Sequence, residues 1–462
     1  LALHELADQD WNKFIDYNVQ DVNLLVKLEE KLQYIPLLRM LSYVGLTTLE
    51  GAMGTIGVIN GALTVRARKR GEVISTFVRN GNRDHKNPGA YVAEPKRGFK
   101  ENVISFDANS LYPNVMISLN TSPETKVGKI EKNDGKEITI QHNSGRLFKL
   151  SKKDFVKFLK DEECALSKAG FLFSQKKQGI IPEFLEYYYN QRVEIKKGLF
   201  TNQKKLKKAP IGDDDIAASV TLTGQAVIKY SNELLKDFMR AEVGSDNISE
   251  RDLEECIVYN DTDSSYISIS PLIENGVKFW ESKEDALVHQ ETYDKIQEIE
   301  DYLNEGITSW SRKALLTSDP RFVFKREMIA DVATFLQKKR YVMHILDDEG
   351  IKENKFKYTG VEVVRTTMPN AIKPYAKGII ETMLTTQDLG KTNKIFNEAY
   401  ETFKTGIKGY EKHAVQCREW QTVKGMPVHA KSAYYYNQIL EKLGTGNKYE
   451  SISSGDKVRF MY

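Results

Sequence analysis

Residues 257–269, Ile-Val-Tyr-Asn-Asp-Thr-Asp-Ser-Ser-Tyr-Ile-Ser-Ile, place β-branched and aromatic residues on either side of a short polar centre. This pattern predicts a β-hairpin. A second predicted strand, residues 102–107 (Asn-Val-Ile-Ser-Phe-Asp), also ends on a carboxylate. A carboxylate at the end of a buried apolar strand costs free energy unless a cation faces it. We therefore expect Asp107, Asp261 and Asp263 to share a site on adjacent strands of an antiparallel sheet.

The spacing of the two hairpin aspartates carries a further expectation. Asp261 and Asp263 are two positions apart, so on a regular strand both side chains point to one face. Oxygen ligands suit divalent cations, and a carboxylate cluster of this kind can serve two-metal phosphoryl transfer. An isolated Asp-Thr-Asp is more often an acidic hairpin turn that holds no ion. The surrounding motifs decide between these two interpretations.

Length and composition limit the class of protein. The chain has 462 residues and a mass of 52.8 kDa, which corresponds to about three domains of roughly 150 residues each. Apolar residues make up 40% and charged residues 28%, and no uncharged apolar run nears the roughly 18 residues of a membrane span. We expect a globular protein with no membrane partner. The net charge of +3 is too small to indicate nucleic-acid binding by itself.

The three cysteines, Cys164, Cys256 and Cys417, are far apart and odd in number. This usage argues against a disulfide framework or a cysteine zinc site and suits a reducing cytoplasm, with Cys256 in the core. The chain begins without an initiator methionine or a signal peptide, and we expect it to be a segment of a longer chain.

Periodicity organises the rest of the chain. A turn-rich stretch at residues 80–89 indicates a domain boundary, residues 90–92 are expected to form a strand, and residues 131–145 a polar surface excursion. Helical spacing predicts helices over Trp11–Leu32 and over residues 182–208, 216–240, 371–385 and 391–405.

Three motifs, in order, resemble those of the family B DNA polymerases. Residues 107–113 (Asp-Ala-Asn-Ser-Leu-Tyr-Pro) resemble motif A, residues 259–264 (Tyr-Asn-Asp-Thr-Asp-Ser) resemble motif C, and residues 338–341 (Lys-Lys-Arg-Tyr) match the basic motif that follows. The resemblance covers essentially the whole chain and is strongest to the phage T4-like branch. It implies an α+β right-hand fold with an antiparallel-sheet palm, helical fingers and thumb, and the C-terminal end of an RNase H-like exonuclease domain.

The resemblance also implies domain boundaries. These are residues 1–80 for the exonuclease end and linker, 81–181 for the first part of the palm, 182–218 for shortened fingers, 219–358 for the second part of the palm, and 359–462 for a partial thumb. The implied function is template-directed addition of dNTPs to a primer 3′-hydroxyl during phage DNA replication, in the cytoplasm of the infected host cell.

Site residues follow from the matched positions. The resemblance implies Asp107, Asp261 and Asp263 as catalytic residues, and two Mg²⁺ ions, replaceable by Mn²⁺, held by these three with Ala108 and Glu327. The incoming nucleotide would contact Ser110, Leu111, Tyr112, Arg192 and Lys196, with Tyr112 excluding a ribose 2′-hydroxyl. Primer-template DNA would contact Tyr91, Thr262, Lys338, Lys339, Arg340 and Tyr341.

Arg192 and Lys196 are one helical turn apart, so both cations face the same way and suit a triphosphate. Without the family context, a solvated helix face is the more frequent explanation of such a pair. Glu327, Tyr91 and Tyr112 likewise have ordinary structural alternatives: a surface acid, a turn residue and a core aromatic.

The chain departs from the family pattern in several places. Motif B, Lys-x-x-x-Asn-Ser-x-Tyr-Gly, does not occur, and only Lys207 or Lys208 stands near its expected place. Asn260 replaces the usual motif C glycine. Tyr17 and Asp21 resemble the last exonuclease motif without its partner carboxylates, so we expect negligible proofreading, and no clamp-binding tail follows Tyr462.

These departures keep two alternatives open. One is a catalytically impaired fragment, or one subunit of a split polymerase, that binds primer-template DNA with a complementary chain or a sliding clamp as partner. The other is a metal-dependent nuclease that uses the same carboxylates.

Overall fold

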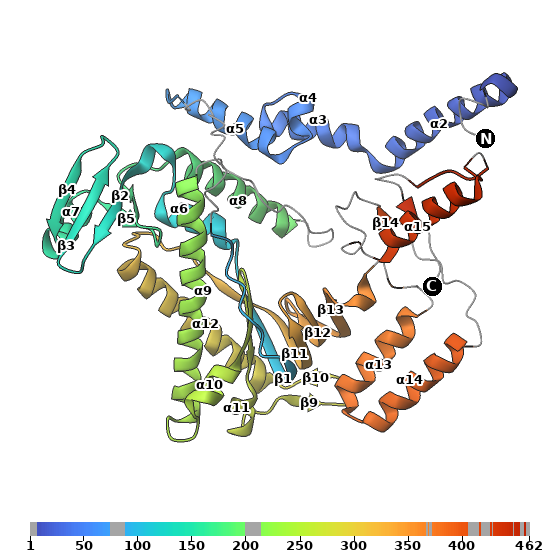
Figure 1. Ribbon diagram of the computed structural model, residues 1–462. Coiled ribbons are helices and arrows are strands. Elements are labelled where there is room, and N and C mark those ends of the chain that lie inside the picture. The colour runs from blue at the N-terminus through green and yellow to red at the C-terminus, as the bar shows by residue number, and fades with distance from the viewer. Residues whose placement is uncertain are drawn as a thin grey trace.

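The computed structural model describes residues 7–73, 88–198, 214–365, 368, 372–404, 415–416, 426, 428–446, 448–452 and 457–458. Helices and antiparallel sheets are mixed along the chain (Figure 1), which confirms the α+β prediction at this level. No helix in these ranges is both long and apolar enough to cross a membrane.

The helices are α2 (Trp11–Leu32), α3 (Tyr34–Gly45), α4 (Leu49–Ala52), α5 (Thr55–Lys69), α6 (Leu111–Leu119), α7 (Lys152–Asp161), α8 (Ile180–Gly198), α9 (Asp214–Val243), α10 (Glu250–Cys256), α11 (Ser270–Glu274), α12 (Gln290–Ala314), α13 (Lys373–Thr386), α14 (Leu389–Lys404) and α15 (Val428–Leu443). Two 3₁₀ turns are η1 (Pro123–Thr125) and η2 (Glu362–Val364).

The strands are β1 (Gly98–Ala108), β2 (Lys126–Asn133), β3 (Glu137–His142), β4 (Leu147–Ser151), β5 (Cys164–Leu166), β6 (Phe171–Ser174), β7 (Ile257–Asp261), β8 (Ser264–Ser268), β9 (Trp280–Ser282), β10 (Leu287–Val288), β11 (Phe324–Gln337), β12 (Arg340–Asp348), β13 (Ile351–Thr359), β14 (Val415–Gln416) and β15 (Lys457–Val458).

A six-stranded antiparallel sheet forms the centre of the molecule, in the order β13-β12-β11-β1-β8-β7. Its middle strand β1 is buried from Val103 to Phe106, as expected for a strand that is covered on both faces. The predicted strand at residues 102–107 is therefore correct. The predicted strand at residues 90–92 is not, because only an isolated bridge between Val92 and Asp261 forms there.

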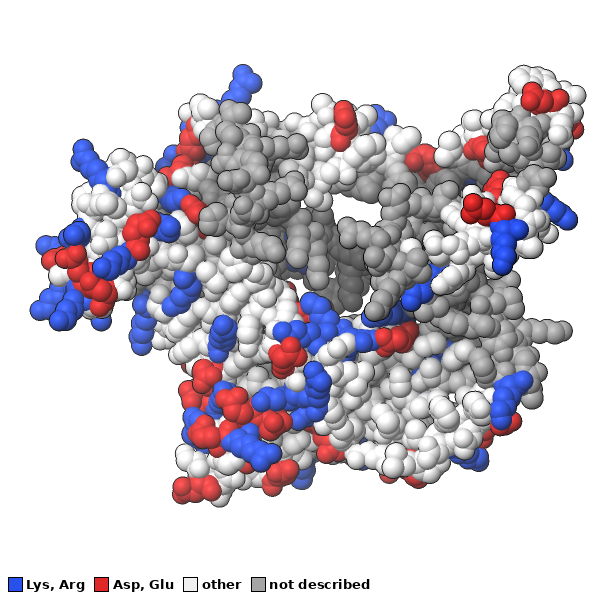
Figure 2. All heavy atoms as spheres, viewed as in Figure 1, with Lys and Arg blue, Asp and Glu red and all other residues white. Residues whose placement is uncertain are grey.

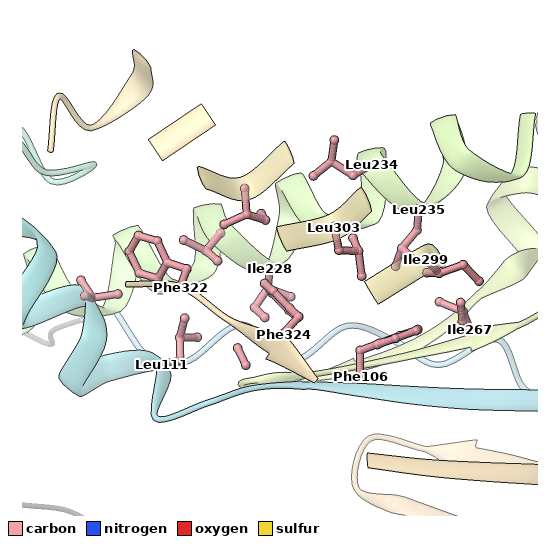
Figure 3. Packing of buried hydrophobic residues seen from close by; sticks show 14 of the residues in the cluster. Phe106, Leu111, Ile228, Leu234, Leu235, Ile267, Ile299, Leu303, Phe322 and Phe324 are labelled. Atoms are coloured by element: carbon pink, nitrogen blue, oxygen red, sulfur yellow. The ribbon is translucent and has the colours of Figure 1, made fainter. Parts of the chain in front are cut away.

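Two long helices, α9 and α12, cover one face of this sheet (Figure 1). Ile296, Ile299, Leu303 and Ile307 recur at helical spacing along α12 and are fully buried. They meet residues of α9 and the sheet in one continuous core, which Figure 3 shows around Phe106, Ile228, Ile267 and Phe324. The opposite face carries a smaller aromatic cluster of Tyr259, Tyr266, Phe335 and Tyr341.

A second sheet, of order β4-β3-β2-β6-β5, projects beside α6 and is covered by α7 on one face (Figure 1). Its strands β2 and β3 include most of residues 131–145. The polar surface excursion expected there is thus a β-hairpin, because the apolar side chains of Ile138 and Ile140 alternate with polar ones and are buried under α7.

The remaining helix predictions hold in part. Trp11–Leu32 is one helix, α2, none of whose residues is buried. The helices expected at residues 216–240, 371–385 and 391–405 are α9, α13 and α14. The helix expected over residues 182–208 is described as α8 to Gly198, and the lysines at 204–208 lie outside the described residues.

Candidate active site

The sheet brings motif A and motif C side by side. Strand β1 pairs with β8, so that Asp107 lies opposite Ser264, and β8 pairs with β7. The Ser264 hydroxyl donates to Asp107 Oδ1 at 2.9 Å, and the Ala108 amide donates to the Asp263 carbonyl at 2.8 Å. Asp107 and Asp263 therefore lie on neighbouring chain segments, as the sequence predicts.

The geometry of the β7–β8 turn corrects one prediction. Strand β7 ends at Asp261 and β8 begins at Ser264, so Asp263 belongs to the turn and not to a regular strand. Thr262 has φ +65°, and the Asp263 amide bonds back to the Asp261 carbonyl at 2.7 Å. The two aspartates are not on one strand face, because the strand has already reversed between them.

The two hairpin carboxylates consequently have different surroundings. Asp261 Oδ1 accepts hydrogen bonds from Lys339 Nζ at 2.6 Å and from the Thr262 hydroxyl at 3.1 Å. Asp263 instead lies near Tyr112: burial raises the pKa of the Tyr112 hydroxyl, and the charge of Asp263 raises it further. Asp107, Asp263 and Tyr112 thus form one group, and Asp261 with Lys339 forms another.

The basic motif at residues 338–341 occupies the tight turn between β11 and β12. Lys339 has φ +59°, and its amide donates to the Tyr259 hydroxyl at 2.9 Å. A Cβ atom on Gly360 would lie 2.0 Å from the Lys339 carbonyl, so a glycine is required where β13 ends. The hydrogen bond to Tyr259 and the ion pair with Asp261 fix the turn against the β7–β8 hairpin.

The other three members of this motif point in different directions. Lys338 pairs with Glu94 at 3.1 Å, and Arg340 pairs with Glu362 and donates to the Gly360 carbonyl at 3.2 Å. Tyr341 is only 5% exposed. Its hydroxyl is 2.9 Å from that of Tyr266. The expected contact of the Tyr341 side chain with DNA is therefore corrected: this ring supports the sheet.

Tyr112 lies in the first turn of α6, which leaves β1 through Ser110 in the left-handed conformation at φ +47°. Leu111 is buried in the core, so only its backbone could face a nucleotide. Gly224 of α9 packs against the Tyr112 ring: a Cβ atom there would lie 2.9 Å from Tyr112 Cε1. The absence of a side chain at Gly224 sets how deeply the ring can sit.

One face of α9 contacts several residues around this site, which the sequence reasoning missed. Besides Gly224, Gln225 donates to the Gly89 carbonyl at 2.7 Å, Lys229 lies 4.9 Å from the centre of the Tyr91 ring, and Asn232 bonds Asn260. Positions 224, 225, 229 and 232 fall on one side of a helix. No local signal in the sequence singles out this face, because polar residues also occur elsewhere along α9.

Tyr91 also reaches the motif C turn through its backbone, since its carbonyl accepts from the Thr262 amide at 2.9 Å. Asn260, read from the sequence as a mild replacement for glycine, is buried. Its side chain exchanges amide hydrogen bonds with Asn232 at 2.9 and 3.1 Å and donates to the Ser265 hydroxyl at 2.8 Å.

Comparisons with known proteins give sequence similarities over this region. The family model described as DNA polymerase family B matches residues 54–214, a range that includes Asp107 and Tyr112. The chain is 21% identical to the DNA-directed DNA polymerase of Enterobacteria phage T4 over 99% of its length and 58% of that protein. It is 22% identical to the Escherichia phage RB69 enzyme of the same name, over 83% of this chain and 49% of that one.

The chain is therefore similar in sequence to DNA polymerase family B.

The chain also resembles DNA polymerase 1 of Pyrococcus abyssi, at 26% identity over 68% of its length and 34% of the archaeal protein. It spans about half the length of the two phage relatives. The alignment with the phage T4 protein runs over 558 positions, whereas this chain has 462 residues. The T4 protein therefore has residues within that alignment that lack a counterpart here.

The donor set of this site suits Mg²⁺. Asp107 and Asp263 supply carboxylate oxygens, which this ion prefers. Glu327 lies on the same side of the sheet, at an irregularity opposite Ser105, whose hydroxyl donates to it at 3.4 Å. Across the described residues no three His, Cys, Asp or Glu side chains converge as a metal cluster.

Other expected site residues lie apart from this group. Arg192 is exposed on α8, and the side chain of Lys196, on the same helix, lies outside the described residues. Tyr17 and Asp21 are exposed on α2.

Cys256 is buried as expected, and burial raises the pKa of its thiol to about 12, so it is neither a ligand nor a nucleophile. Cys417 lies outside the described residues.

Proposed function

We propose that this chain is the polymerase part of a DNA-directed DNA polymerase, which adds dNTPs to the 3′-hydroxyl of a primer on template DNA. The observation that carries the proposal is the meeting of Asp107 and Asp263 beside Tyr112 at the ends of β1 and the β7–β8 hairpin. The match to the family model and the names of the phage relatives support it.

Each part of the site has a role in this proposal. Asp107 and Asp263, with the Ala108 carbonyl and Glu327, would hold two Mg²⁺ ions, which when bound neutralise charge during phosphoryl transfer. Asp261 orients Lys339 through their ion pair. The free amides at the start of α6, at Leu111 and Tyr112, suit the triphosphate, because helix N-termini bind anions. The Tyr112 ring bars a ribose 2′-hydroxyl.

The proposed domains follow the central sheet. The sheet with α9 and α12 is the palm, α8 with Arg192 and Lys196 forms the fingers, and α13 and α14 begin the thumb. Helix α2 is the end of an exonuclease domain. DNA would lie along Tyr91, Thr262 and the turn at Lys338, Lys339 and Arg340, where cations contact phosphates.

A second candidate function is a DNA-binding scaffold, or a subunit of a split polymerase, that holds primer-template DNA without incorporating nucleotides by itself. Two sequence observations favour it: motif B is missing after Lys208, and the T4 protein has aligned residues that this chain lacks. Motif B would supply a phosphate-binding lysine.

Primer extension distinguishes the two candidates. A labelled primer-template is incubated with Mg²⁺ and either all four dNTPs or only the first templated one. The polymerase proposal predicts extension that stops at the first position when the other dNTPs are omitted, and that Asp107→Asn abolishes it. Retained, salt-sensitive DNA binding without extension would establish the scaffold. Shortening of the DNA in the absence of dNTPs would indicate a nuclease.

A further inference from the structure

The lobe formed by β2, β3, β4 and α7, here called the basic lobe, concentrates positive charge. Residues 126–161 contain ten lysines and arginines but five acidic residues, whereas the whole chain has 67 basic and 64 acidic residues. The remainder of the chain is therefore net acidic. Figure 2 shows blue side chains projecting from this lobe at the left of the view.

Three of the acidic residues of the basic lobe have local roles. Asp134 accepts the amides of Lys136 and Glu137, at 3.1 and 2.8 Å, and so closes the β2–β3 turn. Asp154 accepts the Ser151 hydroxyl at 2.7 Å at the start of α7. Glu131 pairs with Lys129 at 3.4 Å. These contacts leave most of the positive charge uncompensated.

Eight cations of the lobe are exposed and have no ion-pair partner within 4 Å in the described part of the chain. They are Lys132, Lys136, Arg146, Lys149, Lys152, Lys153, Lys157 and Lys160. Such a set is an electrostatic footprint for a polyanion.

The strand register arranges two of these lysines in a row. Ile138 and Ile140 point towards α7, where they pack with Phe155 and Leu159. Thr139 therefore points to the opposite face, and it pairs with Lys132 on one side and Lys149 on the other. The row crosses three adjacent strands on the face that α7 does not cover.

Apolar side chains accompany the cations at the edge of the lobe. Strand β4 is the last in the sheet order, and its Leu147 and Phe148 are 63% and 41% exposed. Phe148 pairs with Ile140, so its ring lies on the α7 side of the edge strand, whereas Lys149 lies on the face of the lysine row. A single strand that passes over the edge of β4 can therefore place its phosphates on the row and a base on the Phe148 ring, since exposed aromatic rings on sheets stack bases. A basic surface that served only solubility would not require the exposed apolar side chains of Leu147 and Phe148.

We propose that the basic lobe binds single-stranded nucleic acid, namely the unpaired template ahead of the primer end, through its phosphates and through stacking on Phe148. The template assignment rests on the proposed function. The lobe follows motif A directly in the chain: α6 has nine residues, about 13 Å of helix, and joins the site to β2 through η1.

The test is binding of a fluorescent thymidine oligomer of about 20 nucleotides, measured by anisotropy at several salt concentrations. The Lys132→Ala/Lys149→Ala double variant is compared with Lys278→Ala/Lys283→Ala, a matched pair of exposed lysines outside the lobe. Only the lobe variant should bind more weakly, and the slope of log K against log salt should fall by about 0.7 per lost contact. Phe148→Ala should weaken binding about fivefold or more.

Equal weakening in both lysine pairs, or no change in either, would overturn the proposal. So would inorganic polyphosphate binding as tightly as the oligomer with no effect of Phe148→Ala, because the lobe would then be a general polyanion surface. All these substitutions are exposed, and unchanged unfolding midpoints establish that the variants fold.

A second arm tests the template assignment. The affinity for a primer-template should rise when its 5′ overhang is lengthened, and the lobe variant should lose this gain while it keeps the affinity for a short overhang. An overhang length without effect would overturn the assignment to template. The oligomer assay involves neither a primer nor dNTPs, so a failure of primer extension and a failure of the lobe are separate results.

Discussion

At the scale of single residues, the side chains around the β7–β8 turn have different contacts and different roles in the site. Asp261 and Asp263 are two positions apart, yet Lys339 neutralises the first, while the second lies beside Tyr112 and the strand of Asp107. Two contacts connect α9 to the site: Asn260 bonds Asn232 of this helix through an amide pair, and Gly224 of the helix leaves room for the Tyr112 ring. Two predictions belong to this scale.

Gly224→Ala should relax sugar discrimination. The new methyl group would lie 2.9 Å from Tyr112 Cε1, so the ring has to shift away from its present position. We expect the preference for dNTPs over rNTPs to fall by about tenfold, the scale at which a pocket senses one methyl group. The measurement is the ratio of single-turnover incorporation efficiencies for a matched dNTP and rNTP. Gly378→Ala on α13, where a Cβ meets nothing within 4 Å, is the control, and equal ratios in both variants would refute the prediction.

The Asn232–Asn260 pair should be energetically coupled. Removing either amide leaves the other with a buried hydrogen-bonding group unpaired, at about 1–3 kcal/mol of unfolding free energy. Asn232→Ala and Asn260→Ala together should therefore cost less than the two single costs added, with a coupling of about 0.5–3 kcal/mol. Urea unfolding of the four proteins measures this, and strict additivity would show that the pair does not act as a unit.

At the scale of elements, ion pairs and hydrogen bonds hold the helices and strands around the site in place. Helix α8 is held by α5, since Glu183 pairs with Arg66 at 3.2 Å and with Arg70 at 2.8 Å, while Arg70 also donates to the Gln178 carbonyl. In the central sheet, His344 of β12 bonds Asp331 of β11 and Asn354 of β13, and Tyr358 of β13 donates to Glu381 of α13. Each network gives one prediction.

Glu183→Gln should destabilise the junction of α5 and α8. Arg66 and Arg70 are only 22% and 16% exposed, and they would lose their shared counter-ion, although partial solvation limits the loss to about 1 kcal/mol. The measurement is the free energy of unfolding in urea. Glu162→Gln removes a pair with Lys176 in which both side chains are about half exposed, and it should change that free energy by less than about 0.5 kcal/mol. Equal effects would contradict a special role for the junction.

His344 should make stability depend on pH. Burial favours its neutral form, but hydrogen bonds to Asp331 at 2.7 Å and Asn354 at 2.8 Å, with the charges of Asp331 and Glu381, prevail and raise its pKa above the ordinary value. The charged form therefore stabilises the fold below the unfolded-state pKa of about 6.5, and this contribution is lost as pH rises through the folded-state pKa. His344→Gln should flatten that part of the stability–pH profile, measured by urea unfolding between about pH 6 and 8. An unchanged slope would contradict it.

At the scale of the whole molecule, the sequence predicted individual helices and strands better than it predicted contacts between distant segments. The hairpin of residues 257–269, strand β1 and helix α9 were predictable because each has a strong period and apolar composition. The pairing of β1 with β8 followed from carboxylates at the ends of apolar strands. The face of α9 that touches Tyr112, Tyr91 and Asn260 was not predictable, because it depends on contacts between distant segments.

The errors have equally physical causes. The strand argument for Asp261 and Asp263 assumed continuous pleating, but a turn residue with positive φ, Thr262, separates them. Tyr341 was grouped with its cationic neighbours by motif, yet strand alternation turns its ring into the core. Residues 131–145 are the polar surface excursion that was expected, but their hairpin was not predicted, because polar residues outnumber the two isoleucines that α7 buries.

The central claim is that Asp107 and Asp263 form the reacting centre of a polymerase, with Asp261 outside it. Single-turnover incorporation of one templated dNTP in Mg²⁺ by the wild type, Asp263→Asn and Asp261→Asn tests this most directly. We predict incorporation by the wild type, a loss of at least about a hundredfold in Asp263→Asn, and a smaller loss in Asp261→Asn. No incorporation by the wild type, or a rate for Asp263→Asn equal to or above that of Asp261→Asn, would contradict the claim.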